Sequence, residues 1–480
     1  MNDSAKIGRQ TTIAAVIVIA GVALAAVATF RLGRPRLEPI EVSQQTTYII
    51  TPTRADGWVD YPEAVDWMRR ASLDAGGANA SVSLLRALGR DALPVDSDRG
   101  ALLERLKISD AGDGTSLLKP LAKFAGPDAA SAPEPPPATM RWLWARCGGG
   151  APGDDAKPPL ARIRGWLAQA EGPLASLREA AKAAALYVPV SRGRRVGDIA
   201  RVNAPLLADA GRALACDAAV KLLQGDAPAS WADVDALWRL GQLLARGASI
   251  GEYGTALELW RMAKTGTVDL AESPAASPAL LSAVEVGLGA KLGFPPASET
   301  WMFHRLATLE AIGTPLLPAP RPGAQTGGPF GRIGTTAKLV AINQAFDDVD
   351  VAFQAADPKQ RIARVDQLAP ATAARIGITG AAVLGVEIQA VSCQRLASLA
   401  IALARRQRDG GKLPASLAEL GGIPKDPGSG GSFVYKPDGR RFLVYGVGGN
   451  GRDDGGDAAT DVVASAQEPP SLTAHADPSP

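Results

Sequence analysis

Residues 381–406 read AAVLGVEIQAVSCQRLASLAIALARR, and the segments RDGGKLP, PASLAELG and IPKDPGSGGSFVYKPDGRRFLVYGVGGNGRDDGGD follow as far as Asp457. In the first segment, small and apolar side chains recur every three or four residues, which predicts one long helix. They are Val383, Val386, Ala390, Cys393, Ala397 and Ala400. Arginines crowd its end, where the helix dipole favours cations, and Gly410-Gly411 is expected to stop it. A second, short helix is expected over residues 414–421.

Two short strands are expected after these helices, over Ser432 to Lys436 and Arg441 to Tyr445. Asp438-Gly439 lies between them, and this dipeptide readily adopts the positive φ angles that a tight hairpin turn needs. An isolated two-stranded hairpin is at best marginally stable in water, so we expect this one to pack on the preceding helix. The helix and hairpin together form a predicted C-terminal module, residues 369–457.

The order of these elements resembles the C-terminal module of the major pseudopilins of type II secretion. It also resembles the tail of an uncharacterised family of bacterial membrane-anchored proteins. The residues that carry the match are Leu413, Pro414, Leu417, Leu420, Pro424, Lys425, Asp426, Pro427, Tyr435, Tyr445, Gly448, Asp453, Asp454, Gly455 and Gly456. The resemblance covers about 75 of the 480 residues. Because the N-terminus has no prepilin motif, we do not expect processing or assembly as a pilin.

The N-terminus contains an uncharged apolar run, IAAVIVIAGVALAAVATF, from Ile13 to Phe30. At about 1.5 Å per residue it nearly matches the ~30 Å hydrocarbon core of a bilayer. We therefore predict a transmembrane helix over residues 13–30, preceded by a cytoplasmic tail (1–12) and followed by a tether (31–57). The lipid bilayer is the partner that this run implies.

Two alternatives remain for this segment and its orientation. Ala26-Val27-Ala28 mimics a signal-peptidase site, so a cleaved signal peptide is the rival of an anchor. Basic residues flank both ends with a slight excess after the run, which favours a cytoplasmic body, but long domains translocate largely regardless of nearby charge. The resemblance to envelope-facing proteins favours a single-pass cell-membrane protein with an extracytoplasmic body.

Between tether and module, residues 58–368 are expected to form a helical body. Pro/Gly-rich loops are expected near 109–159 and 314–336, and a disordered tail over 458–480. The expected helices are Glu63–Leu73, Ala80–Leu88, a helix–turn–helix over Leu160–Leu186 broken at Gly172-Pro173, Ala204–Leu223, Trp231–Leu244, Glu252–Lys264, Pro278–Lys291, Ser298–Ile312, Thr336–Ala356 and Gln360–Leu368. The fold class is thus mainly α, with an N-terminal transmembrane helix, a multi-helix body and a small helix-plus-hairpin module.

The composition of the chain argues against several classes of function. The 51 basic and 49 acidic residues leave a net charge of +2, which argues against a dedicated nucleic-acid-binding protein. The cysteines, Cys147, Cys216 and Cys393, are far apart and odd in number, so we expect small core residues rather than a disulfide framework or a metal site. With two histidines in the whole chain, imidazole-rich metal sites are disfavoured.

Two glycine motifs are interpreted as structural. Residues 247–251 match G-x-S-x-G, but a nucleophile elbow follows a strand, whereas the preceding segment is helical, so a loop between two helices is expected. Residues 446–451 match G-x-G-x-x-G, but a dinucleotide site needs a following helix. Acidic residues follow here and would repel a phosphate, so we reject a nucleotide site.

An acidic turn is the one candidate metal site. GGNGRD at residues 448–453 fits the start of a calcium-binding nonapeptide, and calcium prefers hard oxygen ligands on a glycine-rich turn. Asn450, Asp453, Asp454 and Asp457 could supply those ligands. The resemblance to pseudopilins, which bind calcium in this region, points the same way. The alternative is a solvated acidic turn without metal.

No catalytic set can be assembled from the sequence. Acidic residues on the predicted helices could do acid–base work if two converged: Glu63, Asp66, Glu252, Glu258 and Glu285. We expect them to be solvated or capping residues. The function that the sequence favours is a non-catalytic, membrane-anchored envelope protein with an interaction role. The alternatives are a carboxylate-using hydrolase with a helical cleft and a secretion-system accessory protein that contacts envelope or secretion proteins.

Overall fold

The computed structural model of the chain describes residues 40–55, 57–71, 73, 78–92, 103–106, 137–147, 160–190, 195–199, 201–290, 293–313, 336–377, 379–439, 441–458 and 460–465. The predicted cytoplasmic tail, the predicted transmembrane helix and the first part of the tether lie outside these residues. Most of the two predicted Pro/Gly-rich loops and residues 466–480 also lie outside them.

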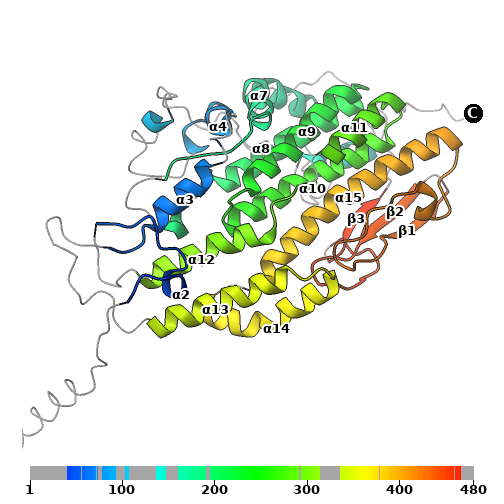
Figure 1. Cartoon of the computed structure of the whole chain (residues 1–480). Coiled ribbons are helices and arrows are strands. Elements are labelled where there is room, and N and C mark those ends of the chain that lie inside the picture. The colour runs from blue at the N-terminus through cyan, green and yellow to red at the C-terminus, as the bar shows by residue number, and fades with distance from the viewer. Residues whose placement is uncertain are drawn as a thin grey trace, which may run out of the picture. The chain divides into compact units, whose positions relative to one another are not determined.

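The described chain is mainly helical and ends in a small three-stranded antiparallel sheet (Figure 1). This confirms the mainly α class and the presence of a small β element. The α-helices are α2 (Gln44–Thr47), α3 (Tyr61–Arg70), α4 (Ala80–Leu88), α6 (Pro137–Arg146), α7 (Leu160–Ala181), α8 (Ala204–Leu223), α9 (Ala227–Ala245), α10 (Ile250–Glu272), α11 (Pro278–Ala290), α12 (Ala297–Gly313), α13 (Thr336–Phe353), α14 (Pro358–Ile376) and α15 (Gly380–Gly410). Short 3-10 helices are η1 (Gly89–Ala92), η4 (Val196–Asp198) and η6 (Leu417–Leu420), and the strands are β1 (Val434–Asp438), β2 (Arg441–Gly446) and β3 (Val462–Ser465).

The chain divides into two compact units. The smaller contains the described parts of residues 1–59 and 309–343, and the larger contains the rest. In the smaller unit, Ser43 caps α2 in a reciprocal capping box, and the Asn343 side-chain amide donates to the Gln45 carbonyl over 2.9 Å. The second half of the expected tether is therefore folded chain. All further description concerns the larger unit.

Four helices, α8, α9, α10 and α15, form the centre of the larger unit (Figure 1). Consecutive pairs from α8 to α10 pack on one another, and α15 packs along α10 although more than a hundred residues separate them. Gly241 on α9 leaves room for the Trp260 side chain of α10, because a Cβ there would lie 2.4 Å from the nearest atom of the indole ring. A glycine at that point lets the indole lie across α9 and donate to the Trp238 carbonyl.

The long C-terminal helix confirms the first prediction. α15 extends slightly beyond the expected range at both ends, and Gly411 in the left-handed conformation ends it. Among the described residues, it is the one helix long and apolar enough to cross a bilayer, with a mean hydropathy of 1.2. However, 61% of that apolar window is buried inside the protein, as expected of a core helix.

Helix α7 corrects one prediction. It runs unbroken through Gly172-Pro173, where a helix–turn–helix was expected. Proline inside a helix costs about 3 kcal/mol because it removes a hydrogen bond and crowds the preceding turn. Leu174 and Leu177 are both fully buried, and each such burial contributes about 1.5–3 kcal/mol. Continuing the helix keeps both side chains in the core, and this outweighs the local cost of Pro173.

The sheet confirms the hairpin and corrects the predicted tail. β1 and β2 pair antiparallel with Asp438 opposite Arg441. Asp438 is therefore the last residue of β1 and not part of the turn that was expected at Asp438-Gly439. β3 then pairs antiparallel with β2, from Leu443 opposite Ser465 to Gly446 opposite Val462. The disordered tail predicted for 458–480 was wrong over this strand. Val462 and Ala464 are buried, and β3 packs on α10 and α15, which stabilise a strand too short to be recognised by composition.

The cysteines correct another prediction. Cys147 and Cys216 form a disulfide with their Cα atoms 4.5 Å apart, so two of the three are a covalent link and not isolated core residues. The link joins the end of α6 to the middle of α8. Cys393 on α15 is a free, buried thiol, as expected. Sequence spacing missed the pair because helix packing brings the two cysteines together across 69 residues.

Candidate functional site

The acidic turn connects β2 to β3. Its glycines serve packing: a Cβ at Gly449 would lie 2.8 Å from the Gly385 Cα on α15, and one at Gly448 would collide with the Thr460 carbonyl. Backbone therefore touches backbone where the turn crosses the long helix. The first and last glycines of the G-x-G-x-x-G match have other roles, since a Cβ at Gly446 would lie 2.6 Å from Asp426 and Gly451 has a positive φ of 67°.

The four predicted ligands already have hydrogen-bond partners, and two of them, Asn450 and Asp454, bond to each other. Asp453 accepts from the Tyr445 hydroxyl over 3.0 Å, and the Asn450 amide donates to Asp454 over 2.8 Å. The bond from Asn450 lowers the pKa of Asp454 below its ordinary value. The carbonyl of Asp457 accepts from the Thr460 amide. Among the described residues, no three acidic, cysteine or histidine side chains are placed to hold one metal ion.

Asp461 is a fourth acid in this turn, and the sequence analysis missed it. Its Oδ2 accepts from the amides of Asp454 and Gly456 over 3.2 and 2.8 Å, and the residue is 4% exposed. Its Oδ1 is buried and has no hydrogen-bond partner among the residues that the structure describes. A buried carboxylate oxygen without a donor costs free energy that a cation could recover. The signal for Asp461 was its position just before the apolar strand, but the predicted module ended at residue 457.

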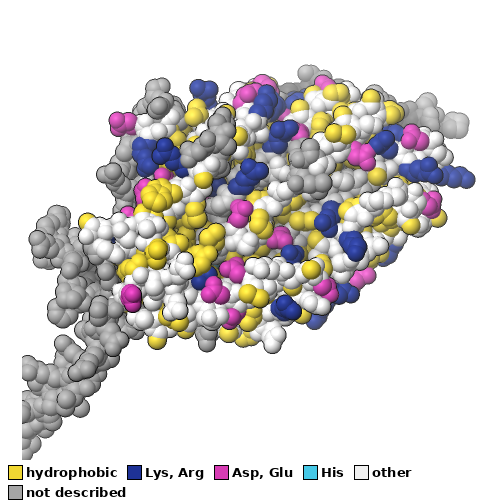
Figure 2. All heavy atoms as spheres, in the orientation of Figure 1, with side chains coloured by type: hydrophobic (Ala, Val, Ile, Leu, Met, Phe, Trp, Pro, Cys, Tyr) yellow, Lys and Arg dark blue, Asp and Glu magenta, His cyan; other side chains and the backbone are white. Residues whose placement is uncertain are grey.

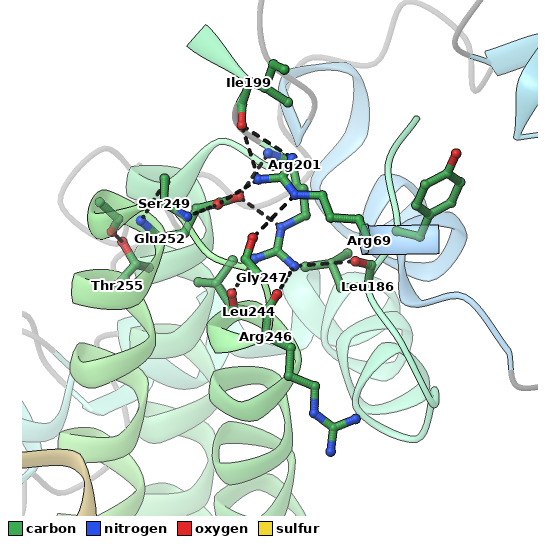
Figure 3. A network of polar contacts seen from close by, with 12 residues as sticks. Arg69, Leu186, Ile199, Arg201, Leu244, Arg246, Gly247, Ser249, Glu252 and Thr255 are labelled. Atoms are coloured by element: carbon green, nitrogen blue, oxygen red, sulfur yellow. Dashed lines mark hydrogen bonds and ion pairs between the residues drawn. The ribbon is translucent and has the colours of Figure 1, made fainter. Parts of the chain in front are cut away.

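A second polar cluster lies deep in the helical body (Figure 3). The carboxylate of Glu252, at the start of α10, lies 3.1 Å from Arg201 Nε and 3.5 Å from Arg69 Nη2, and all three side chains are 2% exposed. Glu252 also accepts from the backbone amides of Arg201 and Ser249. Burial alone would raise the pKa of Glu252, but the two arginines lower it below its ordinary value.

Ser249 is part of this cluster and has a structural role. It caps α10 by accepting from the Glu252 amide, while Glu252 accepts from the Ser249 amide in return. The G-x-S-x-G match at residues 247–251 is therefore a turn between α9 and α10, as expected. Arg69 donates to the Gly247 carbonyl in the same turn, so the turn supplies a hydrogen-bond acceptor for a buried arginine.

Asp66 lies near the same cluster. It accepts from the Tyr187 hydroxyl over 3.1 Å and from the Val190 amide over 2.7 Å, and Arg105 lies 3.5 Å away. Burial, with Asp66 as a neighbour, raises the pKa of Tyr187 to about 12. The interactions of Asp66 tie α3 to the segment after α7, which is a structural role.

The other acids considered for acid–base work lie apart from this cluster. Glu63 accepts from Trp67 one turn along α3, and Glu258 pairs with Arg212 at 3.7 Å on the surface. Glu285 pairs with Arg405. Within the described chain, the carboxylates singled out in the sequence are each paired with their own partners and do not line one cavity together.

Charges mix over the molecular face drawn in Figure 2, where basic and acidic side chains alternate without a patch of one sign. Comparison of the chain with family models, with curated proteins and with solved structures finds no match.

Proposed function

We propose that this protein is a membrane-anchored component of the cell envelope that acts by interaction and not by catalysis, with a helical body outside the cytoplasm. The Cys147–Cys216 disulfide is the observation that carries the proposal, because such links persist in oxidising compartments and are rare in the cytosol. The apolar run of residues 13–30 supplies the anchor.

The buried carboxylates support a non-catalytic role. A catalytic acid or base needs access to substrate and a pKa near the working pH. Glu252 instead has two arginine partners that lower its pKa, and Asp66 is occupied by a hydroxyl, an amide and an arginine. Both acids therefore join elements of the body, and neither is available as the general acid or base that the hydrolase alternative requires.

The topology can be tested with a reporter fused after Pro480 in living bacteria. We expect a reporter that is active only outside the cytoplasm to be active, and one active only in the cytoplasm to be silent. The N-terminus should be retained; a mature N-terminus at Thr29 would show a cleaved signal peptide. Activity of the cytoplasmic reporter would overturn the orientation.

The interaction role can be tested in the same cells by replacing single exposed residues with a photo-crosslinking amino acid. Lys436, on the exposed half of β1, should give discrete adducts with envelope proteins, whereas Val286, 73% exposed on α11, serves as the control. Equal adducts from both positions, or none from Lys436, would contradict the proposal that the sheet contacts envelope proteins.

We further propose that the acidic turn binds calcium. The supporting observation is the buried, unpartnered Oδ1 of Asp461, which lies in the same turn as Asn450, Asp453, Asp454 and Asp457. Carboxylate, amide and carbonyl oxygens are the ligands that calcium prefers, so the donor chemistry fits. A bound ion would neutralise acids that otherwise repel one another, and would thereby rigidify the β2–β3 connection.

Calcium should slow amide hydrogen exchange in residues 442–448 of the whole protein, relative to the same protein in chelator. At a free concentration 100 times the dissociation constant, linkage predicts about 2.7 kcal/mol of added stability. Extracellular-type sites bind at ~0.1–1 mM, so millimolar calcium is needed. The double variant Asp453→Ala, Asp454→Ala should lose the effect, while Asp438→Ala in the exposed hairpin should keep it. An equal effect in wild type and double variant, or none in either, would leave a solvated turn without metal.

A further inference from the structure

A cavity of about 210 Å³ lies between α15 and the segment that joins α11 to α12. At ~30 Å³ per water molecule, it could hold about seven waters or one small organic molecule. Glu387, Val391, Gln394 and Arg395 line it from α15, and Phe294 and Pro296 face them. The four α15 residues share one side of the helix, because three- and four-residue spacings bring side chains onto one face.

The walls of this cavity are fixed by packing. The Phe294 ring meets the Trp260 ring edge to face, with centroids 4.5 Å apart. The Tyr253 hydroxyl donates to the Pro295 carbonyl over 3.1 Å, and the Gln394 side-chain amide donates to the Leu288 carbonyl over 2.9 Å. The cavity is therefore a preformed feature of the helical body.

One of its two charges is neutralised within the protein. The Glu387 carboxylate lies 3.0 Å from Arg361 Nη1 and accepts from the Ala297 amide over 2.6 Å, where α12 begins. An arginine and a helix N-terminus both favour this negative charge. Glu387 therefore contributes a compensated carboxylate to the cavity wall.

The other charge, on Arg395, is compensated only by the more distant Asp426, which partly opposes the effect of burial on the pKa of Arg395. Within the described chain, no carboxylate oxygen lies within 4.0 Å of the Arg395 guanidinium, which donates to the Lys425 carbonyl. The nearby Asp426 is occupied by the amides of Gly428 and Val447 and by the Ser429 hydroxyl. Arg395 is half-buried, and burial lowers its pKa. A poorly hydrated guanidinium gains from an anionic partner, and its planar donors match a carboxylate.

We propose that this cavity binds a small organic carboxylate, with the carboxylate on Arg395 and an apolar body between Phe294 and Val391. The pairing of one charged anchor with apolar walls is the usual composition of a small-ligand site. The inference is independent of the anchor and of calcium, and it adds a ligand-binding activity to the proposed interaction role.

The test uses the full-length protein and benzoate as the probe, with binding followed by ligand-observed NMR or calorimetry. Wild-type protein should bind benzoate saturably below about 10 mM. Arg395→Gln should weaken binding by about tenfold or more, the loss expected for one charge-assisted hydrogen bond. Val391→Trp fills the cavity while keeping the charge, and should also abolish binding. Benzylamine, of similar shape but opposite charge, should not bind.

Arg261→Gln is the matched control, because Arg261 lies on the adjacent α10, contacts Gln389 and does not line the cavity. It should bind benzoate like wild type. The proposal is wrong if wild type shows no saturable binding, if Arg395→Gln binds as tightly as wild type, or if benzylamine binds equally well. Arginine-dependent binding of inorganic phosphate without benzoate binding would also overturn it, since the site would then recognise an anion without an organic body.

Discussion

Glu252→Gln should lower the free energy of unfolding by about 3–5 kcal/mol, measured by denaturant titration at neutral pH. The substitution preserves shape but removes the carboxylate that lies between Arg69 and Arg201. Both guanidinium groups are 2% exposed, so neither can recover hydration without opening the core. Removing one member of a buried ion pair costs far more than the net value of the pair, which is why the loss is large.

Glu258→Gln is the control on the same helix. Its partner Arg212 lies 3.7 Å away, and both side chains are more than a third exposed, so the loss should stay below about 1 kcal/mol. If the two variants lose similar stability, the buried cluster is not a determinant of folding.

The pH dependence of the wild type should differ from that of Glu252→Gln in a defined direction. The folded-state pKa of Glu252 lies below its ordinary value of 4.5, so its ionised form stabilises the fold above that pH. This contribution is lost as pH falls through the lower, folded-state pKa. The stability gap between wild type and variant should therefore narrow in acid. A gap that stays constant from neutral pH to about pH 3 would contradict the lowered pKa.

Removing the disulfide with Cys147→Ala and Cys216→Ala should cost about 2–4 kcal/mol. The link closes a segment of 69 residues, and restricting so long a segment of the unfolded chain gives about 4 kcal/mol in the chain-entropy account. Thermal or denaturant unfolding under oxidising conditions measures the loss. A reducing agent should lower the stability of the wild type to that of the double variant and leave the double variant unchanged.

Cys393→Ala is the control for the loss of a buried sulfur. It should cost about 1 kcal/mol and keep the sensitivity to reductant. Labelling of the unfolded, unreduced wild type with a thiol reagent should find one free thiol. Three reactive thiols would show that the pair does not form in the protein.

The elements that the sequence predicted well are those with local signals. α15 follows from its apolar periodicity and its Gly410-Gly411 ending, and the hairpin from Asp438-Gly439. α4 was placed at its correct bounds by Asn79 before it and Gly89 after it. In each case the residues that define the element lie within it or beside it, so neighbouring positions suffice.

The features that the sequence missed depend on residues far apart in the chain. Pro173 remains within a helix because elements distant in the sequence bury Leu174 and Leu177, which follow it. The disulfide and the cluster around Glu252 arise where separate helices meet. The cavity beside Arg395 could not be foreseen, because an arginine without a carboxylate partner is recognisable only once its surroundings are known. In the acidic turn, the sequence predicted four acidic or amide ligands but missed Asp461.

The chain can complete its fold only after its last strand, β3, has been synthesised. The Lys264 ammonium on α10 donates to the Val463 carbonyl of β3, across 199 residues of sequence. Lys264 is partly buried, and burial lowers its pKa, so the bond to that carbonyl replaces hydration that the ammonium has lost. During synthesis from the N-terminus, Lys264 on α10 therefore lacks its partner on β3 until residue 465 has been made. Shortening the chain by its final strand would thus expose the centre of the helical body, far from the site of the cut.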